Sequence, residues 1–327
     1  MEATDSRPTM LVLRALKLGD LLVAVPALTA LRRHWPGHRI VLATSGWLAP
    51  IVELVDGVDE LLPTPGLSRP LDVAAGTVDI AVNLHGRGPE SGTLLDAVRP
   101  ARLIAHAPDS PDGPEWVDGI LERERWARLV RAAGAPADAG AVAIRVPEGR
   151  PIVAGAAVLH VGAFYGSRRW PAERFAEVAR TLASRGEQVV FTGGAEERDR
   201  ALGVAALAGL PEEAVLAGRL ELAGFAAVIA AARAVVSVDT GAAHLASAYG
   251  IPSVVIFGPA PPEEWGPPEH GPHIVLTDAS LRRGDTFSDE PDPALLAVSA
   301  GDVLAALDRL ELGSVSRPVS RAAPSAG

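Results

Sequence analysis

Residues 234–258 contain the clearest strand–helix–strand unit in the chain, and they read Ala234-Val-Val-Ser-Val238-Asp-Thr-Gly241-Ala-Ala-His244-Leu-Ala-Ser-Ala-Tyr249-Gly-Ile-Pro-Ser253-Val-Val-Ile-Phe257-Gly258. The segments 235–238 and 253–257 are short and almost wholly apolar, which is typical of strands buried on both faces. Residues 241–249 between them have the length of a helix, which Gly250 and Pro252 end. Because such a unit joins neighbouring parallel strands by a right-handed crossover, the stretch predicts a parallel α/β sheet.

The alternation of short apolar runs with helix-length segments continues over most of the chain. Strands are predicted at residues 10–14, 40–43, 78–83, 102–105, 157–161 and 187–192, and helices at 20–34, 122–133, from Pro171 onward, 196–207, 221–232 and 295–310. A Pro/Gly-rich stretch at 146–151 divides this series in two. We therefore expect an α/β protein with two Rossmann-like parallel-sheet domains that face a central cleft. The expected domains are residues 1–150 and 151–312, followed by a disordered tail at 313–327.

The composition excludes several classes of protein. Of 327 residues, 48% are hydrophobic and 21% are charged, which is typical of a globular protein. The absence of cysteine excludes disulfide bonds, thiolate metal ligands and a cysteine nucleophile. The longest apolar stretch, 21–31, contains Pro26 and is far shorter than the roughly 20 residues that span a bilayer. The N-terminal residues lack the apolar core of a secretory signal, so a cytoplasmic protein is expected.

The charge balance is acidic. The net charge of −10 opposes binding to nucleic acid and generic attraction to an anionic membrane. Residues 1–150 carry 16 basic and 19 acidic side chains (−3), whereas residues 151–327 carry 14 and 21 (−7). An anionic ligand of the second half therefore needs local hydrogen-bond donors. Lys17 is the only lysine among 30 basic residues, a bias that we interpret as the codon usage of a GC-rich genome and not as phosphate recognition.

The strongest candidate site is the junction between a buried strand and a helix at Val238-Asp239-Thr240-Gly241. Free backbone N–H groups and the positive end of the helix dipole favour an anion at such a junction. Gly241 lets a phosphate approach the backbone closely, and His244 could donate a hydrogen bond to the same anion. The alternative is structural: Asp239 or Thr240 caps the helix, and His244 is a core residue with satisfied hydrogen bonds.

Two more strand-to-helix junctions lie in the second half. The loop at 162–171 offers Arg168 or Arg169, whose guanidinium suits phosphate. At 192–197, a carboxylate such as that of Glu197 could accept hydrogen bonds from ribose hydroxyls, or could only complement the helix dipole. Three such junctions in one half suggest a site for a nucleoside diphosphate.

The first half has a junction of its own at Leu18-Gly19-Asp20, after the first predicted strand. Taken alone, an Asp at this position is a helix cap. The junction also lies at the same sheet edge as the phosphate junctions, on the opposite wall of the expected cleft. A base that acts on a second substrate belongs at that place.

An ordered set of motifs extends these observations along the chain. The motifs are Gly19-Asp20, Arg169-Trp-Pro171, Gly193-Gly-x-x-Glu197, Asp239-Thr-Gly-x-x-His244, Gly250-Ile-Pro252 and Phe257-Gly-Pro259. The set, which covers residues 10–310, resembles glycosyltransferase family 9, the ADP-heptose:lipopolysaccharide heptosyltransferases and their relatives. The resemblance implies a GT-B architecture, with the acceptor on the N-terminal domain and the nucleotide sugar on the C-terminal one. It also implies inverting, metal-independent transfer.

The resemblance assigns roles to individual residues. Asp20 matches the catalytic base, and Arg168 stands where the family usually has a lysine. The positions expected to bind the donor are Arg168, Glu197, Leu220, Asp239, Thr240, Gly241, Ala242 and His244. In the first half, His85 and Arg87 follow a predicted strand and are candidates for contact with the acceptor, with a purely structural loop as the equal alternative.

The implied reaction moves a sugar, with heptose from ADP-heptose favoured, onto a hydroxyl of a glycan or a small molecule. Arg168 and the N–H groups after Thr240 would stabilise the leaving diphosphate, while Asp20 would accept the hydroxyl proton. The resemblance implies that the reaction needs no cofactor and no metal, and the absence of an Asp-x-Asp triplet is consistent with this. The acidic residues Asp289, Glu290 and Asp292 are expected to be solvated. We further expect a monomer without a transmembrane segment, acting in the cytoplasm or in peripheral contact with the inner face of the membrane.

Two other functions stay open at this point. A nucleotide-sugar epimerase would use the same scaffold without an acceptor, and a regulatory module would bind the nucleotide without turnover. A nicotinamide dehydrogenase is disfavoured, because the first strand leads into Ala15-Leu-Lys-Leu-Gly-Asp20 and not into Gly-x-Gly-x-x-Gly.

Overall fold

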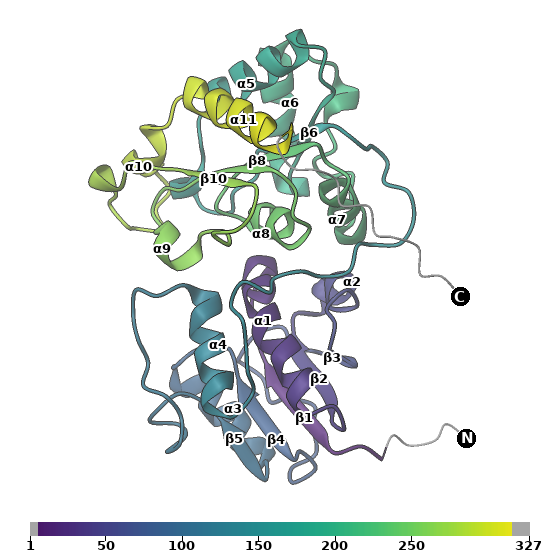
Figure 1. Cartoon of the computed structure of the whole chain (residues 1–327), viewed down its shortest axis with the longest axis vertical. Coiled ribbons are helices and arrows are strands. Elements are labelled where there is room, and N and C mark those ends of the chain that lie inside the picture. Colours follow the sequence, from purple (N-terminus) through teal and green to yellow (C-terminus); the bar gives the residue numbers. More distant parts are fainter. Residues whose placement is uncertain (1–5, 316–327) are drawn as a thin grey trace.

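The computed structural model describes residues 6–315, which form two lobes stacked along the long axis of the molecule (Figure 1). Each lobe contains a five-stranded sheet in which all pairings are parallel. The first sheet has the order β3-β2-β1-β4-β5 and the second β10-β9-β8-β6-β7. The strands are β1 (Thr9–Leu13), β2 (Arg39–Thr44), β3 (Glu60–Pro63), β4 (Ile80–Asn83), β5 (Arg102–Ile104), β6 (Ala157–His160), β7 (Val189–Thr192), β8 (Ala234–Val238), β9 (Ser253–Ile256) and β10 (His273–Leu276). The prediction of two Rossmann-like parallel-sheet lobes is confirmed.

Helices cover both faces of each sheet. The helices are α1 (Leu18–His34), α2 (Ala49–Val52), α3 (Pro89–Val98), α4 (Glu122–Ala132), α5 (Ala172–Ser184), α6 (Arg198–Ala208), α7 (Leu222–Ala230), α8 (Gly241–Ala248), α9 (Pro262–Trp265), α10 (Pro293–Leu296) and α11 (Ala300–Val315). In the first lobe α1 and α4 pack on one face and α3 on the other. In the second lobe α5, α6 and α11 pack on one face, and α7 and α8 on the face towards the first lobe. One hydrophobic cluster therefore runs from the first sheet through α1 and α8 to the second sheet.

The lobes meet at α1 and α8, which lie at the junction of the two lobes in Figure 1, and the first turns of the two helices contact each other. Neither glycine at this contact could carry a side chain without displacing its neighbour. A Cβ atom on Gly19 would lie 2.9 Å from His244 Cδ2, and a Cβ atom on Gly241 would lie 2.7 Å from Leu18 Cδ2. The absence of these two Cβ atoms therefore lets the two helix tips approach each other.

Four structural predictions need correction or comment. The sequence analysis missed β3 and β10, which are short edge strands without a fully buried residue. The single helix predicted at 295–310 is two helices, because the chain breaks helical geometry between α10 and α11. Helix α11 continues to Val315, beyond the start of the predicted tail, and residues 316–327 lie outside the described residues. The boundary predicted at residue 150 falls in the connection between α4 and β6 and stays a prediction.

Across residues 6–315, none of the helices combines the length and the hydropathy that a bilayer-spanning segment requires.

We predict that Gly241→Ala lowers the free energy of unfolding by about 1–3 kcal/mol, because the new methyl group forces Leu18 away from the helix tip. Chemical denaturation of the purified protein measures this change. Gly203→Ala, in α6, is the matched control, since an added Cβ atom there meets nothing within 4 Å. The control should raise stability by about 0.5–1 kcal/mol, as expected for Ala in a helix. Equal effects of the two substitutions would show that the tips are not tightly packed.

Candidate active site

The site lies where the strand order reverses in each sheet. In the first sheet β1 and β4 are neighbours, and the chain continues from β1 to β2 on one side and from β4 to β5 on the other. In the second sheet β6 and β8 are neighbours, and the chain continues from β6 to β7 on one side and from β8 to β9 on the other. Ligands of open α/β sheets bind at such switch points, beyond the carboxyl ends of the strands. The segments that directly follow these four strands carry Asp20, in the first turn of α1, and His85, Arg168 and Asp239, so candidate residues from both switch points lie at the junction of the lobes.

A cavity of about 230 Å³ lies between the lobes at this place. Both walls contribute, with the loop of β1 on one side and the loops of β6 and β8 on the other. Its lining residues are Lys17, Gly19, Asp20, Phe164, Arg168, Asp239, Thr240, Gly241, His244 and Trp265. Most candidates from the second-lobe junctions and the candidate base Asp20 thus share one cavity.

The N-terminus of α8 points its free donors at this cavity. Thr240 is the N-cap residue, but its side chain makes no capping hydrogen bond and its hydroxyl donates to the Val238 carbonyl at 3.3 Å. Asp239 does not cap the helix either, because its carboxylate faces Arg168 and His244. Neither side chain therefore caps α8, and the roles of these residues in donor binding stay predictions. Because no side chain caps α8, the N–H groups of its first turn make this helix tip suitable for an anion.

The second-lobe wall contains a cluster of three interacting polar side chains, Arg168, Asp239 and His244. The Arg168 Nη1 atom lies 3.0 Å from Asp239 Oδ2 and donates to the Asp239 carbonyl at 3.1 Å. The other carboxylate oxygen lies 3.8 Å from His244 Nε2. Asp239 is buried, so its charge orients the guanidinium and the imidazole and is shielded from solvent. Burial lowers the pKa of His244 below its usual 6.5, although the charges of Asp239 and Asp20 oppose that effect.

Asp20 is both a helix cap and a cavity residue. Its Oδ2 atom accepts a hydrogen bond from the Lys17 backbone N–H at 3.1 Å, so Asp20 does cap α1, as expected for an Asp at this position taken alone. Its Oδ1 atom lies 3.5 Å from Arg14 Nη2, and its side chain is 24% exposed. The carboxylate therefore has a fixed orientation while one side stays accessible from the cavity.

The buried residue Arg14 holds Asp20 in place from behind. The Arg14 side chain is 1% exposed and donates from Nε to the Asp20 carbonyl at 2.8 Å. It also donates to the Leu84 carbonyl at 2.5 Å, pairs with Glu122 at 3.4 Å, and lies 4.8 Å from the centre of the Trp126 ring. Burial lowers the pKa of Arg14, and the charges of Asp20 and Glu122 counteract this. A buried guanidinium needs such partners, so the Arg14 contacts are part of the site's architecture.

Sequence reasoning missed three residues of the cavity wall. Lys17 and Phe164 contact each other across the lobes, with Nζ 3.5 Å from the ring centre. Trp265 belongs to α9 and lines the cavity, although nothing in the sequence around it indicates a binding site. The buried Arg123 of α4 positions this segment by donating to the carbonyl groups of Gly266 and Pro267. Lys17 and Phe164 lie close in sequence to the predicted residues Asp20 and Arg168, so the position of these junctions could have indicated them, whereas packing between distant segments brings Trp265 to the cavity.

The loop at 162–171 forms hydrogen bonds with the distant segment 286–292, which includes Asp292. Ser167 donates from Oγ to the Thr286 carbonyl at 2.9 Å, and the Asp292 N–H donates to the Ser167 carbonyl at 3.0 Å. Asp292 was expected to be solvated, but it is buried. Its carboxylate accepts hydrogen bonds from the N–H groups of Arg283, Gly284 and Ala294, which explains how a charged group is accommodated there.

The other predicted site residues lie outside the cavity wall. Glu197 caps the turn after β7, where Oε2 accepts from the Gly194 N–H at 2.5 Å, and this carboxylate lies against the end of β6 at Gly162. Leu220 packs on the apolar cluster just before α7, and Ala242 is buried behind Gly241. Their donor-binding roles stay predictions.

The two candidates for acceptor contact have different surroundings. His85 lies close enough to Arg14 and Asp20 that both charges act on its pKa, which burial lowers most strongly. Its buried Nδ1 atom has no hydrogen-bond partner among the described residues. Arg87 turns away to Asp118, at 3.7 Å, and to the ring of Trp116. The structure therefore brings His85, but not Arg87, close to the candidate base.

Within residues 6–315, no group of three or more His, Asp or Glu side chains is arranged to hold a metal ion. The expectation that the reaction needs no metal stays a prediction.

Comparison with known sequences places these features in a family. The sequence profile of glycosyltransferase family 9 (heptosyltransferase) matches residues 103–286, more than half of the chain. Lipopolysaccharide heptosyltransferase 2 of Salmonella typhimurium is 23% identical over 314 residues, covering 82% of this chain and 89% of that protein. Lipopolysaccharide heptosyltransferase 1 of Pseudomonas aeruginosa is 45% identical over 102 residues, but these cover 31% of this chain and 28% of that protein.

A solved structure shows the same fold. The ADP-heptose lipopolysaccharide heptosyltransferase II of E. coli superposes with a TM-score of 0.77 at 22% identity, covering 94% of this chain and 100% of that chain. The predicted GT-B architecture is thereby confirmed.

We predict that His244 titrates below pH 6.5 and that Asp239→Asn lowers the pKa of His244 further. The reason is that the Asp239 carboxylate, 3.8 Å from Nε2, stabilises the protonated ring and partly opposes the effect of burial. The ¹⁵N chemical shifts of the imidazole, followed by NMR as a function of pH, measure both values. His160 is the internal control, since burial alone lowers its pKa to about 4. A rise in the pKa of His244 in the variant would contradict the assigned contact.

Proposed function

Because the chain belongs to glycosyltransferase family 9 (heptosyltransferase), we propose that this glycosyltransferase moves heptose from ADP-heptose onto a hydroxyl of a glycan acceptor, with inversion and without a metal. The observation that carries the proposal is the shared cavity. Asp20 lies on its first-lobe wall, and Arg168 and the N-terminus of α8 lie on its second-lobe wall. Such a transfer needs a base and a site for a departing anion on opposite sides of one carbon atom.

The second-lobe wall would bind the leaving diphosphate. As the bond to the anomeric carbon breaks, negative charge grows on the diphosphate oxygen. The N–H groups at Gly241 and Ala242 and the Arg168 guanidinium can donate to that charge. At about 230 Å³ the cavity is smaller than the about 300–1,000 Å³ typical of sites for whole ligands. It would therefore enclose the diphosphate and the sugar, while the nucleoside extends towards Glu197 and Leu220.

The first-lobe wall would activate the acceptor. The hydroxyl becomes more acidic as its oxygen bonds to the anomeric carbon, and the Asp20 carboxylate takes the proton. Arg14 and the Lys17 N–H keep this carboxylate oriented towards the cavity. Because base and leaving group act from opposite walls, a single displacement inverts the anomeric centre.

The curated relatives support a lipopolysaccharide-type acceptor, since their names describe lipopolysaccharide heptosyltransferases. The first lobe itself is slightly acidic, so a small-molecule acceptor is the second candidate. A cytoplasmic location, peripheral contact with the membrane and a monomeric state stay predictions.

We predict that ADP stabilises the protein against thermal unfolding more than UDP, GDP or CDP does, each tested at the same concentration.

Incubation with ADP-heptose and a heptose-free lipopolysaccharide acceptor, in the presence of a chelator, should yield a heptosylated product detected by mass spectrometry. An altered sugar formed from the donor alone would identify an epimerase. ADP binding without turnover for any acceptor would identify a binding module, and a chelator-sensitive reaction would contradict the metal-free mechanism.

We predict that Asp20→Asn lowers the turnover rate by about 10²–10⁴-fold, the usual contribution of a general base, and leaves ADP affinity nearly unchanged. Asparagine keeps an oxygen that can accept from the Lys17 N–H, so the helix cap survives. Asp308→Asn, at an exposed pair with Arg185, is the control and should keep full activity. Steady-state kinetics and calorimetric titration with ADP measure the two effects. Equal loss of rate and of ADP affinity would contradict the assignment of Asp20 as the base.

A further inference from the structure

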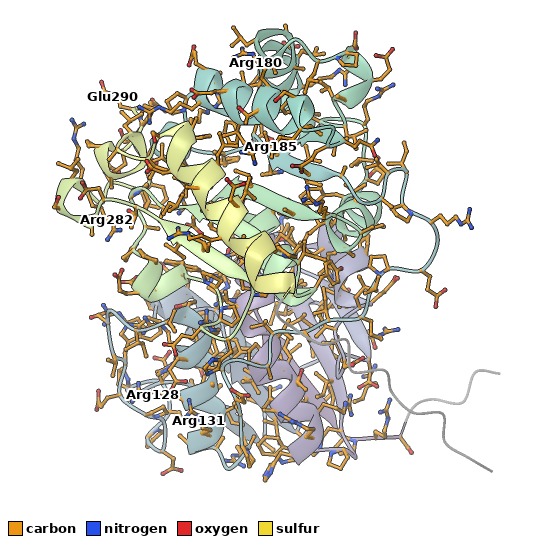
Figure 2. All side chains as sticks on the ribbon, turned by 45° about the horizontal axis from the view of Figure 1, so that its top comes forward. Arg128, Arg131, Arg180, Arg185, Arg282 and Glu290 are labelled. Atoms are coloured by element: carbon orange, nitrogen blue, oxygen red, sulfur yellow. The ribbon has the colours of Figure 1, made fainter. Side chains whose placement is uncertain are left out.

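The single lysine of the chain lies in the active-site cavity. All other basic residues are arginine, and arginine side chains project from the outer helices of both lobes, for example Arg131 on α4 and Arg180 on α5 (Figure 2). If the bias towards arginine reflects codon usage, a retained lysine marks a position where arginine is not equivalent. Lys17 lines the cavity beside Asp20 and Arg168.

The backbone of Lys17 is fixed, and its side chain reaches the other lobe. Lys17 is the N-cap residue of α1, where its N–H group donates to Asp20 Oδ2 at 3.1 Å. Its Nζ atom lies 3.5 Å from the ring centre of Phe164 and 5.1 Å from that of Tyr165. Both aromatic residues belong to the loop of the second lobe that also carries Arg168. The ammonium group therefore lies at the donor side of the cavity although it comes from the first lobe.

Lys17 differs from Arg168 in that its charge is unpaired. Within residues 6–315, no carboxylate oxygen lies within 4.0 Å of Nζ, whereas Asp239 pairs with Arg168 at 3.0 Å. The contact with an exposed ring such as that of Phe164 is a weak interaction, which a phosphate group can replace. Partial burial and the nearby Arg168 charge lower the pKa of Lys17, and Asp20 opposes them, so an arriving anion relieves the unfavourable environment of this cation.

We propose that Lys17 is a further donor-binding residue, whose ammonium group moves from the ring of Phe164 to the diphosphate of the nucleotide sugar. The inference rests on the proposed function and extends it, because the first lobe then contributes a cation to the leaving group. A lysine suits this task, since its compact ammonium group can turn between ring and phosphate, whereas the planar guanidinium of arginine is bulkier and prefers a two-point contact.

Chemical labelling tests this role in the unmodified protein. Amine acetylation has two kinds of target here, the Lys17 side chain and the α-amino group of the chain, because there is no other lysine. Mass spectrometry of a brief reaction gives both rates in one sample. We expect saturating ADP to slow acetylation of Lys17 several-fold and to leave the α-amino group unaffected. Saturating AMP, which has one phosphate, should protect less.

The outcomes separate the inference from the function on which it rests. ADP binding, shown by calorimetry, without protection of Lys17 would overturn the inference and leave the proposed function intact. Absence of ADP binding would overturn both. Protection that appears only when an acceptor is added would assign Lys17 to the acceptor and overturn its role in donor binding.

Substitutions distinguish two roles of Lys17, namely phosphate binding and a contact with Phe164 that only joins the two lobes. We expect Lys17→Met to weaken ADP binding about 5–20-fold, less than a fully buried charged hydrogen bond would imply, because the group is exposed. Phe164→Leu removes the same ring contact but leaves the ammonium group in place, so it should weaken ADP binding less than Lys17→Met does. Arg185→Met, on the outer surface, is the control for loss of one positive charge. Equal weakening by Lys17→Met and Phe164→Leu would show that the contact only joins the lobes, and would overturn the inference.

Discussion

The close approach of two helix tips is the constraint on which this structure depends. The N-termini of α1 and α8 touch because Gly19 and Gly241 carry no Cβ atom, and the contact is sealed by Leu18 on one side and His244 on the other. Helix N-termini carry partial positive charge, so nearby negative charge stabilises their approach. Asp20 and the buried Asp239 supply such charge, and the proposed diphosphate would add to it while substrate is bound.

Charged side chains of the cavity are oriented by charges buried behind them. Arg14 sits behind Asp20, and Asp239 sits behind Arg168 and His244. Both supporting residues are almost fully buried, so their interactions are weakly screened and their geometry is tightly determined. The orientation of the groups that face the cavity is therefore set by the protein itself. Among residues 6–315, no carboxylate pairs with Lys17, so its ammonium group is free to respond to a ligand.

Local sequence predicted the parts of the site that consist of a strand end followed by a helix start. The junctions at Asp20 and at Asp239–Gly241 were recognised because an apolar run, a glycine and a polar residue occur together within a few positions. Phe164 and Trp265 were missed as site residues, because their role depends on contacts with segments far away in the chain. Asp292 was mispredicted for the same reason, since the N–H groups that make its burial possible belong to a loop whose path the sequence does not reveal. The edge strands β3 and β10 were missed because short, half-exposed strands have little hydrophobic signal.

The sequence by itself determined the class of fold, the strand-to-helix junctions and the residue types at their tips, because these depend on hydrophobic periodicity and on local backbone chemistry. The tertiary structure decided which of the expected junctions line one cavity: those at Asp20, Arg168 and Asp239 do, and the one at Glu197 does not. The first sheet has the order β3-β2-β1-β4-β5 and the second β10-β9-β8-β6-β7, so the reversal lies between β1 and β4 in one and between β6 and β8 in the other. Strand order arises from the packing of helices on both faces of the sheet, so the local sequence of a single segment does not indicate it. That order, together with the contact between α1 and α8, places a carboxylate of one lobe opposite the anion site of the other.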